Sequence, residues 1–330
     1  MIFATFREGG ADGTLLVVNR KRTHGVRAIG LAATLQLALD DWDELLPRLK
    51  TLADALEAGK AQGAFELDPN SLMAPLPRAY AFFDAGCYPH HMIPIRQARG
   101  ANMPEDFYER PMMYEGCSAP LVSATEPMLL AEDDAWGIDL EAELAIVTSN
   151  VPAGVARADA AKHIRLIGLY NDISLRKLVP PELARGFGFL QSKPLSSMAP
   201  FLITPDELGE LWSGDFFLGG RYLLHVRGVQ IGDLDPAKDA VYTYSDLIVH
   251  ATKTRPLMAG TLIAAGTLAN EDRRHGCGCL AELRAREQLA GGEALTPFLH
   301  FGDEYRLEYF DLDGTSVFGA IHQRIERAAG

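Results

Sequence analysis

The sequence predicts an α+β protein in which β-strands dominate, with a small N-terminal domain in front of a larger, β-rich one. Short apolar runs of strand length, separated by Gly, Asp and Asn, recur through most of the 330 residues. Helical spacing is confined to a few segments, and the alternation of strands with helices that marks a βαβ fold is missing. Because neither a GxGxxG segment nor a P-loop is present, a nucleotide-binding fold is not expected.

The N-terminal part of the chain combines a hairpin with a helix. Residues 13–18 and 23–28 have the composition of two short strands around a turn-like segment at 19–22. From Thr34 onward, apolar residues recur every three or four positions as far as Leu56, and Gly59 marks the end of this helical pattern. The helix breakers that follow at 68–77 indicate a linker. We therefore expect domains at 1–75 and 76–330.

The larger domain is expected to be built mainly of strands. Its clearest predicted strands are residues 143–148, 223–229 and 305–310. Helical segments are predicted around residues 158–162, 206–212 and 244–252.

Composition narrows the class of function. The formal charge of −13, with no Lys- or Arg-rich stretch, makes nucleic acid an unfavourable partner. No window reaches the roughly 18 uninterrupted apolar residues of a membrane-spanning helix. The apolar start at Met1 is interrupted by Arg7 and Glu8 before a signal sequence develops, so we expect a cytoplasmic protein without a membrane partner.

The four cysteines do not have the spacing of a zinc site. No pair forms a CxxC segment, and we expect reduced thiols in a cytoplasmic protein of this size. They are Cys87, Cys117, Cys277 and Cys279.

Acidic and apolar residues alternate over residues 139–144 with the period of a strand, which predicts that Asp139, Glu141 and Glu143 share one face. An exposed strand face is the alternative, but such a face usually mixes cations among its acids because like charges repel. No cation intervenes here, which favours a bound metal ion. Carboxylate oxygens select hard cations such as Mg²⁺, Ca²⁺ or Mn²⁺.

Further carboxylates are available from distant parts of the chain. Asp172 ends the apolar run 167–172, and Asp84 ends the aromatic run 80–84, which is how strands deliver ligands to the rim of a pocket. Taken singly, each Asp can also be a helix cap or a turn former.

These motifs resemble those of the fumarylacetoacetate hydrolase family, in the same order along residues 78–324. The resemblance implies the family's mixed β-sandwich or roll fold, of the bacterial type with a short N-terminal domain. It also implies a metal site. Its ligands would be Asp84, the Glu-x-Glu acids Glu141 and Glu143, and Asp172 of the Asn-Asp-x-Ser-x-Arg motif.

The resemblance also implies a catalytic set. The family's histidine follows the first aspartate by seven residues, which selects His91 over His90, and its orienting acid follows the Gly-Thr motif as Glu282. A carboxylate that fixes the imidazole tautomer makes the histidine a general base for water. Without the resemblance, a lone His is more often a packed or surface residue.

Lys193 and Arg176 would stabilise an oxyanion, although a lone Lys could equally extend its ammonium group to solvent. Tyr114, Thr267 and Arg99 are the expected substrate contacts. The chain departs from the family pattern at Val179, where the family has a glutamine, and neither Arg96 nor Arg99 has the spacing of the arginine that binds the substrate carboxylate.

The resemblance implies hydrolysis of a carbon–carbon bond in an acidic diketone, such as fumarylacetoacetate to fumarate and acetoacetate, by a metal-dependent homodimer. Aromatic amino acid catabolism, as in tyrosine degradation, is the family's usual setting. Alternatives within the superfamily are hydrolysis of an acylpyruvate such as fumarylpyruvate, and decarboxylation or hydration of a 2-oxo acid. From another class, the chain could be a non-catalytic protein that binds a metal or a ligand.

Overall fold

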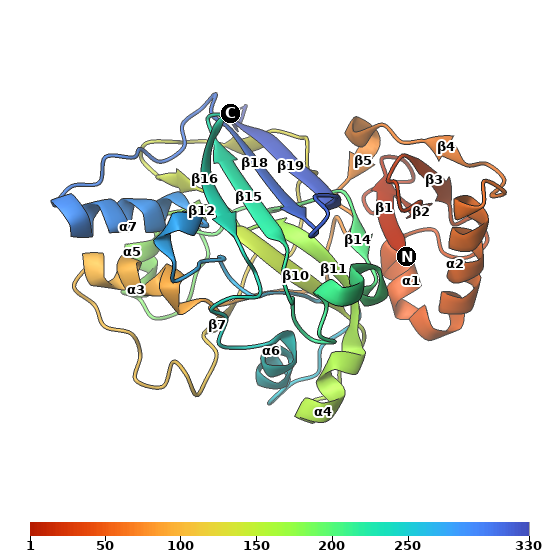
Figure 1. Cartoon of the computed structure of the whole chain (residues 1–330), viewed down its shortest axis with the longest axis horizontal. Coiled ribbons are helices and arrows are strands. Elements are labelled where there is room, and N and C mark those ends of the chain that lie inside the picture. The colour runs from red at the N-terminus through yellow and green to blue at the C-terminus, as the bar shows by residue number, and fades with distance from the viewer. Residues whose placement is uncertain (330) are drawn as a thin grey trace.

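Two large β-sheets, a two-stranded ladder and a set of helices form the protein, for which a computed structural model describes residues 1–329 (Figure 1). The larger sheet has twelve strands. Ten follow one another as β4 (Phe65–Glu66), β3 (His24–Arg27), β2 (Thr14–Val18), β1 (Ile2–Phe6), β14 (Leu202–Ile203), β11 (Ile164–Asn171), β10 (Ala142–Thr148), β17 (Leu262–Ala264), β6 (Phe82–Ala85) and β7 (Met113–Glu115), while β5 (Leu72–Met73) pairs with β1 and β13 (Ser197–Met198) with β11.

The second sheet has five strands, and a separate two-stranded ladder lies beside the larger sheet. The five are β16 (Val229–Leu234), β15 (Arg221–Val226), β18 (Glu304–Phe310), β19 (Ser316–Arg327) and β8 (Met128–Leu130), and the ladder joins β9 (Ile138–Asp139) to β12 (Ser174–Leu175).

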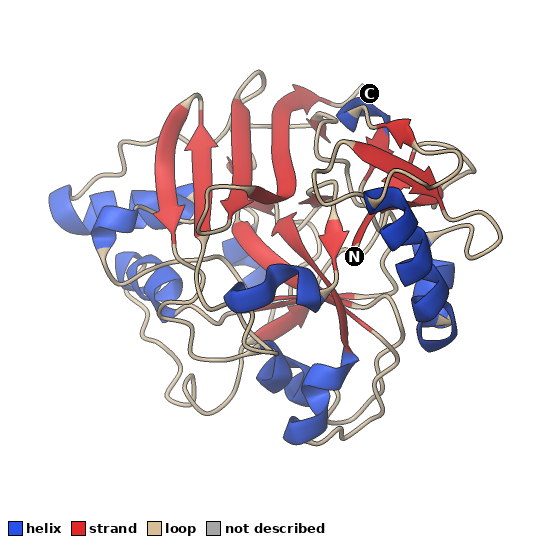
Figure 2. Ribbon diagram, turned by 45° about the vertical axis from the view of Figure 1, so that its right-hand side comes forward, coloured by secondary structure: helices blue, strands red, loops and turns tan. Residues whose placement is uncertain are grey.

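The helices lie around the edges of the strands (Figure 2). The α-helices are α1 (Leu35–Asp40), α2 (Trp42–Glu57), α3 (Pro89–Ala98), α4 (Arg157–Ala160), α5 (Val179–Leu183), α6 (Tyr244–Ala251) and α7 (Leu280–Gly291), and the 3₁₀ turns are η1 (Pro69–Ser71), η2 (Ala161–His163), η3 (Pro205–Leu211) and η4 (Arg273–His275). The predicted β-rich α+β class is confirmed. No helix within the described residues is long and apolar enough to cross a membrane.

The predicted N-terminal hairpin and helix are confirmed, since β2 and β3 pair as antiparallel strands and Thr34 caps α1 through its side chain. The sequence did not predict β1, whose first four residues are buried. This strand pairs with β2 on one side and with β14 on the other. The N-terminal elements, on the right of Figure 1, therefore join the rest of the molecule through one continuous sheet.

The larger part differs from its prediction at two places. Residues 223–229 do not form one strand, because Arg227 and Gly228 both have positive φ (52° and 77°) and make the tight turn between β15 and β16. The predicted helix at 206–212 is the 3₁₀ turn η3, which Gly209 interrupts with φ 53°. The strands at 143–148 and 305–310 and the helix at 244–252 are confirmed as β10, β18 and α6.

Two helices that the sequence did not predict, α3 and α7, pack against each other at one edge of the molecule (Figure 1). The buried positions of α7 include the charged Glu282 beside Leu280 and Ala285, so no apolar stripe is present to reveal this helix. Pro89 at the first position of α3 suits a helix start, but Pro94 lies inside the helix and argues against it in the sequence.

The centre of the large sheet is apolar on both faces. All seven residues of β10 are buried. Ala142, Leu144 and Ile146 belong to the core between the two sheets, whereas Ala145 and Val147 belong to a second core that includes α1 and α2. Strands buried on both faces have no freedom to shift, and this rigidity positions the polar residues at their ends.

Candidate active site

Four buried carboxylates gather where three strands of the large sheet end or begin. Asp84 lies in β6, Glu143 in β10 and Asp172 directly after β11, while Glu141 directly precedes β10. One oxygen from each lies within 4.8 Å of the others. The four predicted metal ligands are thus brought together, and Asp172 stands at a strand end as the sequence suggested.

Asp139, which was expected on one face with Glu141 and Glu143, is not one of the carboxylates that gather in this cluster. The chain leaves extended pairing between β9, which ends at Asp139, and β10, which begins at Ala142, and the alternation of a single strand does not hold across this break. The Asp139 carboxylate instead binds the guanidinium of Arg176 and the start of α7.

Two cations, the buried Lys193 and the partly buried Arg176, lie beside the carboxylates. Lys193 Nζ donates to Glu141 Oε2 at 2.5 Å and to Asp172 Oδ2 at 2.6 Å. Burial alone would lower the pKa of Lys193, but Asp172 and Glu141 raise it well above its usual range, so the ammonium stays charged. Arg176 Nη2 donates to Glu141 Oε1 at 2.7 Å. Lys193 therefore points inward and does not extend to solvent.

These cations neutralise only part of the cluster. Burial alone would raise the pKa of Glu141, but Arg176, Lys193 and His91 lower it well below its usual range. Burial and the neighbouring carboxylates instead raise the pKa of Asp84 and of Glu143. Within residues 1–329, Asp84 Oδ1 and both side-chain oxygens of Glu143 are buried without a hydrogen-bond partner.

The donor set fits a divalent cation. Unpartnered buried carboxylate oxygens are costly, and a hard cation would satisfy them and balance the excess negative charge. All four side chains offer oxygen, which suits Mg²⁺, Ca²⁺ or Mn²⁺.

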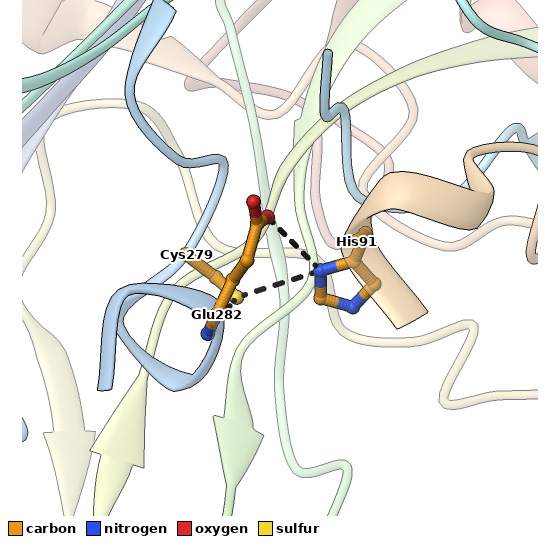
Figure 3. A group of neighbouring side chains, drawn as sticks. All are labelled: His91, Cys279 and Glu282. Atoms are coloured by element: carbon orange, nitrogen blue, oxygen red, sulfur yellow. Dashed lines mark hydrogen bonds and ion pairs between the residues drawn. The ribbon is translucent and has the colours of Figure 1, made fainter. Parts of the chain in front are cut away.

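His91 and Glu282, which are 191 positions apart, meet through the packing of α3 against α7. His91 Nδ1 lies 3.4 Å from Glu282 Oε2 and 3.8 Å from Cys279 Sγ (Figure 3). Glu282 is fully buried, and its other oxygen, Oε1, contacts the guanidinium of Arg286. His90 lies elsewhere, near Asp239 and Glu271. The structure thus brings His91, not His90, to the predicted acid.

Two of the three predicted substrate contacts lie close to this site. Tyr114 Oη donates to Asp172 Oδ2 at 2.6 Å, and its ring lies 5.5 Å from Lys193 Nζ. Thr267 is buried and follows Gly266, whose φ of 89° and contact with the carbonyl of Ala85 leave no room for a side chain. That contact holds the Gly-Thr segment against the strand that carries Asp84.

Arg99 is not brought to the carboxylates. It is exposed at the C-terminal end of α3, about 12 Å along the helix axis from His91. Among the described residues, its side chain has no ion pair or hydrogen bond. Arg96 donates to the carbonyl of Asn102 at 3.0 Å and is committed to the loop after α3.

Two family models match nearly the whole chain. Residues 1–78 match the fumarylacetoacetase N-terminal domain 2, and residues 81–326 match the C-terminal domain of fumarylacetoacetate (FAA) hydrolase. The chain belongs to the fumarylacetoacetate hydrolase family. The resemblance inferred from the sequence motifs is thereby confirmed.

Solved structures of the family share this fold over the whole chain. A fumarylacetoacetate hydrolase from Exiguobacterium antarcticum is 16% identical with a TM-score of 0.69, covering 99% of this chain and 100% of its own. A maleylpyruvate hydrolase from Sphingobium sp. SYK-6, in complex with manganese (II) ion and pyruvate, is 17% identical with a TM-score of 0.65 and full coverage of both chains. A 5-carboxymethyl-2-hydroxymuconate delta-isomerase from Mycobacterium smegmatis is 16% identical with a TM-score of 0.60 and full coverage of both.

No curated protein matches the chain in sequence. The solved family members include hydrolases and an isomerase, and at these identities the likeness shows the shared fold. The reaction must therefore be argued from the site itself.

Sequence reasoning missed three residues that support the family's site. Ser196 Oγ donates to Asp172 Oδ1 at 2.9 Å, Cys279 caps α7, and Arg286 contacts Glu282. Only Arg286 had a local signal, because it stands four positions after Glu282 on one helix face. Val179, which replaces the family glutamine, begins α5 and is partly exposed.

Proposed function

We propose that this protein is a metal-dependent hydrolase that cleaves a carbon–carbon bond in an acidic β-diketone such as fumarylacetoacetate. The observation that carries the proposal is a His–Glu dyad held beside four buried carboxylates and two cations that bind them. The carboxylates suit a metal, the cations suit an anionic substrate, and the dyad suits the activation of water.

Asp84, Glu141, Glu143 and Asp172 would hold the metal. A bound divalent cation supplies Lewis acidity, which polarises the carbonyl groups of a diketone. We expect Mg²⁺ or Ca²⁺, with Mn²⁺ as a further candidate, because each accepts an all-oxygen ligand set. The bound Mn²⁺ of the maleylpyruvate hydrolase structure supports a divalent ion in this family.

The dyad sets the direction of proton transfer. With Nδ1 of His91 facing the Glu282 carboxylate, the Nδ1–H tautomer is favoured and Nε2 is left as the basic nitrogen. Nε2 removes a proton from water as the oxygen attacks the substrate carbonyl carbon. The carbon–carbon bond then breaks, its electron pair goes to the departing carbon, and that carbon takes the proton from His91. Fumarylacetoacetate would give fumarate and acetoacetate.

Lys193 and Arg176 stabilise the negative charge that develops on the attacked carbonyl oxygen. Both are already ordered by carboxylates, so no reorganisation is needed when the charge appears. Tyr114, ordered by Asp172, offers a further polar contact for the substrate.

The dyad favours hydrolysis over decarboxylation, because decarboxylation needs an electron sink but no activated water. A second candidate substrate is an acylpyruvate such as fumarylpyruvate or maleylpyruvate. The maleylpyruvate hydrolase of this fold that was solved in complex with manganese (II) ion and pyruvate supports this candidate. Arg176 and Lys193, which both contact Glu141, offer positive charge for a carboxylate of either substrate.

The test is the loss of near-ultraviolet diketone absorbance with metal-stripped protein reloaded with Mg²⁺, Mn²⁺ or Ca²⁺. Fumarylacetoacetate, fumarylpyruvate, maleylpyruvate and acetylpyruvate are compared. Metal-dependent cleavage supports the proposal and ranks the substrates. Absence of cleavage with every metal overturns it, and favours a 2-oxo acid decarboxylase or a non-catalytic binding protein.

A further inference from the structure

Asp139 is a fully buried carboxylate that lies outside the metal cluster and yet contacts two parts of the site. Its Oδ1 accepts from the backbone N–H of Leu280 at 2.8 Å, and its Oδ2 accepts from that of Ala281 at 2.9 Å. Oδ2 also accepts from Arg176 Nε at 2.8 Å. One side chain therefore binds both the first turn of α7 and the guanidinium beside Glu141.

The contacts with α7 satisfy groups that a helix cannot satisfy by itself. The first amides of a helix have no partner within it, and a carboxylate there also interacts favourably with the helix dipole. Asp139 takes the first two amides, and the sulfur of Cys279 accepts from the third, that of Glu282, at 3.4 Å. The orientation of the first turn, and with it the Glu282 carboxylate, is thereby tied to Asp139.

The contact with Arg176 completes a continuous chain of polar contacts. Arg176 joins Glu141 of the carboxylate cluster to Asp139, Asp139 joins the first turn of α7, and Glu282 on that turn contacts His91. Arg176 and the His91–Glu282 dyad are thus both connected to Asp139.

We propose that Asp139 is a positioning residue that fixes the dyad relative to Arg176. The proposal rests on the hydrolase function proposed above. In this proposal Asp139 does not touch the substrate. It holds Glu282 and Arg176 in fixed relative positions, so that the activated water and the stabilising cation act on the same carbonyl group.

The chain offers a matched control. Asp246 is also an aspartate at the first turn of a helix and also pairs with an arginine, since it accepts from the Thr243 amide at 2.9 Å and from Arg157 Nε at 2.6 Å. It caps α6 and contacts neither the dyad nor the carboxylate cluster. Asp246→Asn therefore reproduces the loss of a cap and an ion pair without disturbing the site.

The experiment compares the wild-type protein with Asp139→Asn and Asp246→Asn, each loaded with Mn²⁺. We expect Asp139→Asn to lower kcat about 10- to 100-fold with KM little changed, as is usual for residues that orient active-site groups. Asp246→Asn should keep the wild-type kcat. Equal effects of the two substitutions on kcat would overturn the proposal.

A second readout does not depend on activity. The imidazole signals of His91 in ¹⁵N-histidine-labelled protein, assigned with His91→Ala, should shift in Asp139→Asn and stay in place in Asp246→Asn. Unmoved His91 signals in Asp139→Asn refute the coupling, whatever happens to the rate. If the wild-type protein cleaves no substrate, the proposed function fails and these signals alone decide the positioning role.

The Asp139→Ser variant replaces Asp139→Asn in this experiment if Asp139→Asn does not fold. A serine hydroxyl can still accept from a helix amide but forms no ion pair with Arg176. The same shift of the His91 signals and the same fall in kcat are expected, and their absence counts against the proposal in the same way.

Discussion

The carboxylate cluster and the His91–Glu282 dyad lie in one site but are positioned by different kinds of structure. The cluster is carried by neighbouring strands, where main-chain pairing such as Ala142 with Asn171 sets the spacing of the side chains. The dyad is carried by two helices that meet only through side-chain packing, and its atoms lie 3.4 Å apart. A sheet register shifts by whole residues or not at all, whereas a helix can tilt slightly.

The carboxylate cluster and the dyad should therefore respond differently to the loss of a side chain. Loss of a cluster carboxylate removes a ligand that no neighbour can replace, because the strands cannot move. Loss of a contact around the dyad should lower kcat partially rather than abolish it.

Glu143→Gln should have the largest effect. It keeps the shape of the side chain but removes the charge from a buried carboxylate without a hydrogen-bond partner. We expect Mn²⁺ affinity, measured by calorimetry, to fall more than the roughly 10- to 100-fold that is typical for outer contacts of a metal site. Glu115→Gln, at the exposed end of β7, is the control and should bind as the wild type does. Unchanged affinity in Glu143→Gln would remove this residue from the metal site.

His91→Ala should abolish most turnover while leaving metal binding intact. Loss of a general base typically costs about 10²- to 10⁴-fold in rate. Calorimetry with Mn²⁺ and steady-state kinetics on the same preparation separate the two effects. His90→Ala is the neighbouring control, and a rate that survives in His91→Ala but falls in His90→Ala would reverse the assignment.

Glu282→Gln should reduce kcat less than His91→Ala does. The amide can still contact the imidazole but no longer stabilises its protonated form, for which we expect roughly a 10- to 100-fold loss. Glu287→Gln lies on the same helix and changes contacts with Leu295 and Thr296 only, so it should keep full activity. If the Glu282→Gln variant keeps the wild-type kcat, the reaction does not depend on this carboxylate.

Glu207→Gln should have the smallest effect on activity and act on stability alone. Burial raises the pKa of Glu207, but hydrogen bonds from Arg20 and the N-terminal amine lower it to about 2. Because the folded-state pKa is depressed, this stabilisation is present above the unfolded pKa of about 4.5 and is lost as the pH falls towards 2.

Since Arg20 is largely exposed, we expect a loss of about 1 kcal/mol in the free energy of unfolding at pH 7. Urea unfolding at pH 7 and at pH 3 checks this, and the difference from the wild type should shrink at the lower pH. A difference that grows on acidification would contradict the assigned cause. An unchanged kcat in this variant would also show that a loss of folding stability alone does not lower kcat as the dyad substitutions do.

Much of the molecule was predictable because it depends on neighbours in the chain. The hairpin of β2 and β3, the helix that starts after Thr34, and the strand that delivers Asp172 all follow from local periodicity and turn residues. The Glu-x-Glu spacing likewise predicted two acids in one cluster, since alternate residues of an extended chain face the same way.

The contacts between residues far apart in the chain depend on how the helices and strands pack. No local pattern links His91 to Glu282, because their contact depends on α3 packing against α7, and α7 has no apolar stripe to announce it. Periodicity predicted Asp139 on one face with Glu141 and Glu143, whereas it lies outside their cluster and binds Arg176 and the first turn of α7. The exposure of Arg99 was equally beyond the sequence. Local chain geometry determines the direction of a side chain, whereas its partners are determined by how whole elements pack.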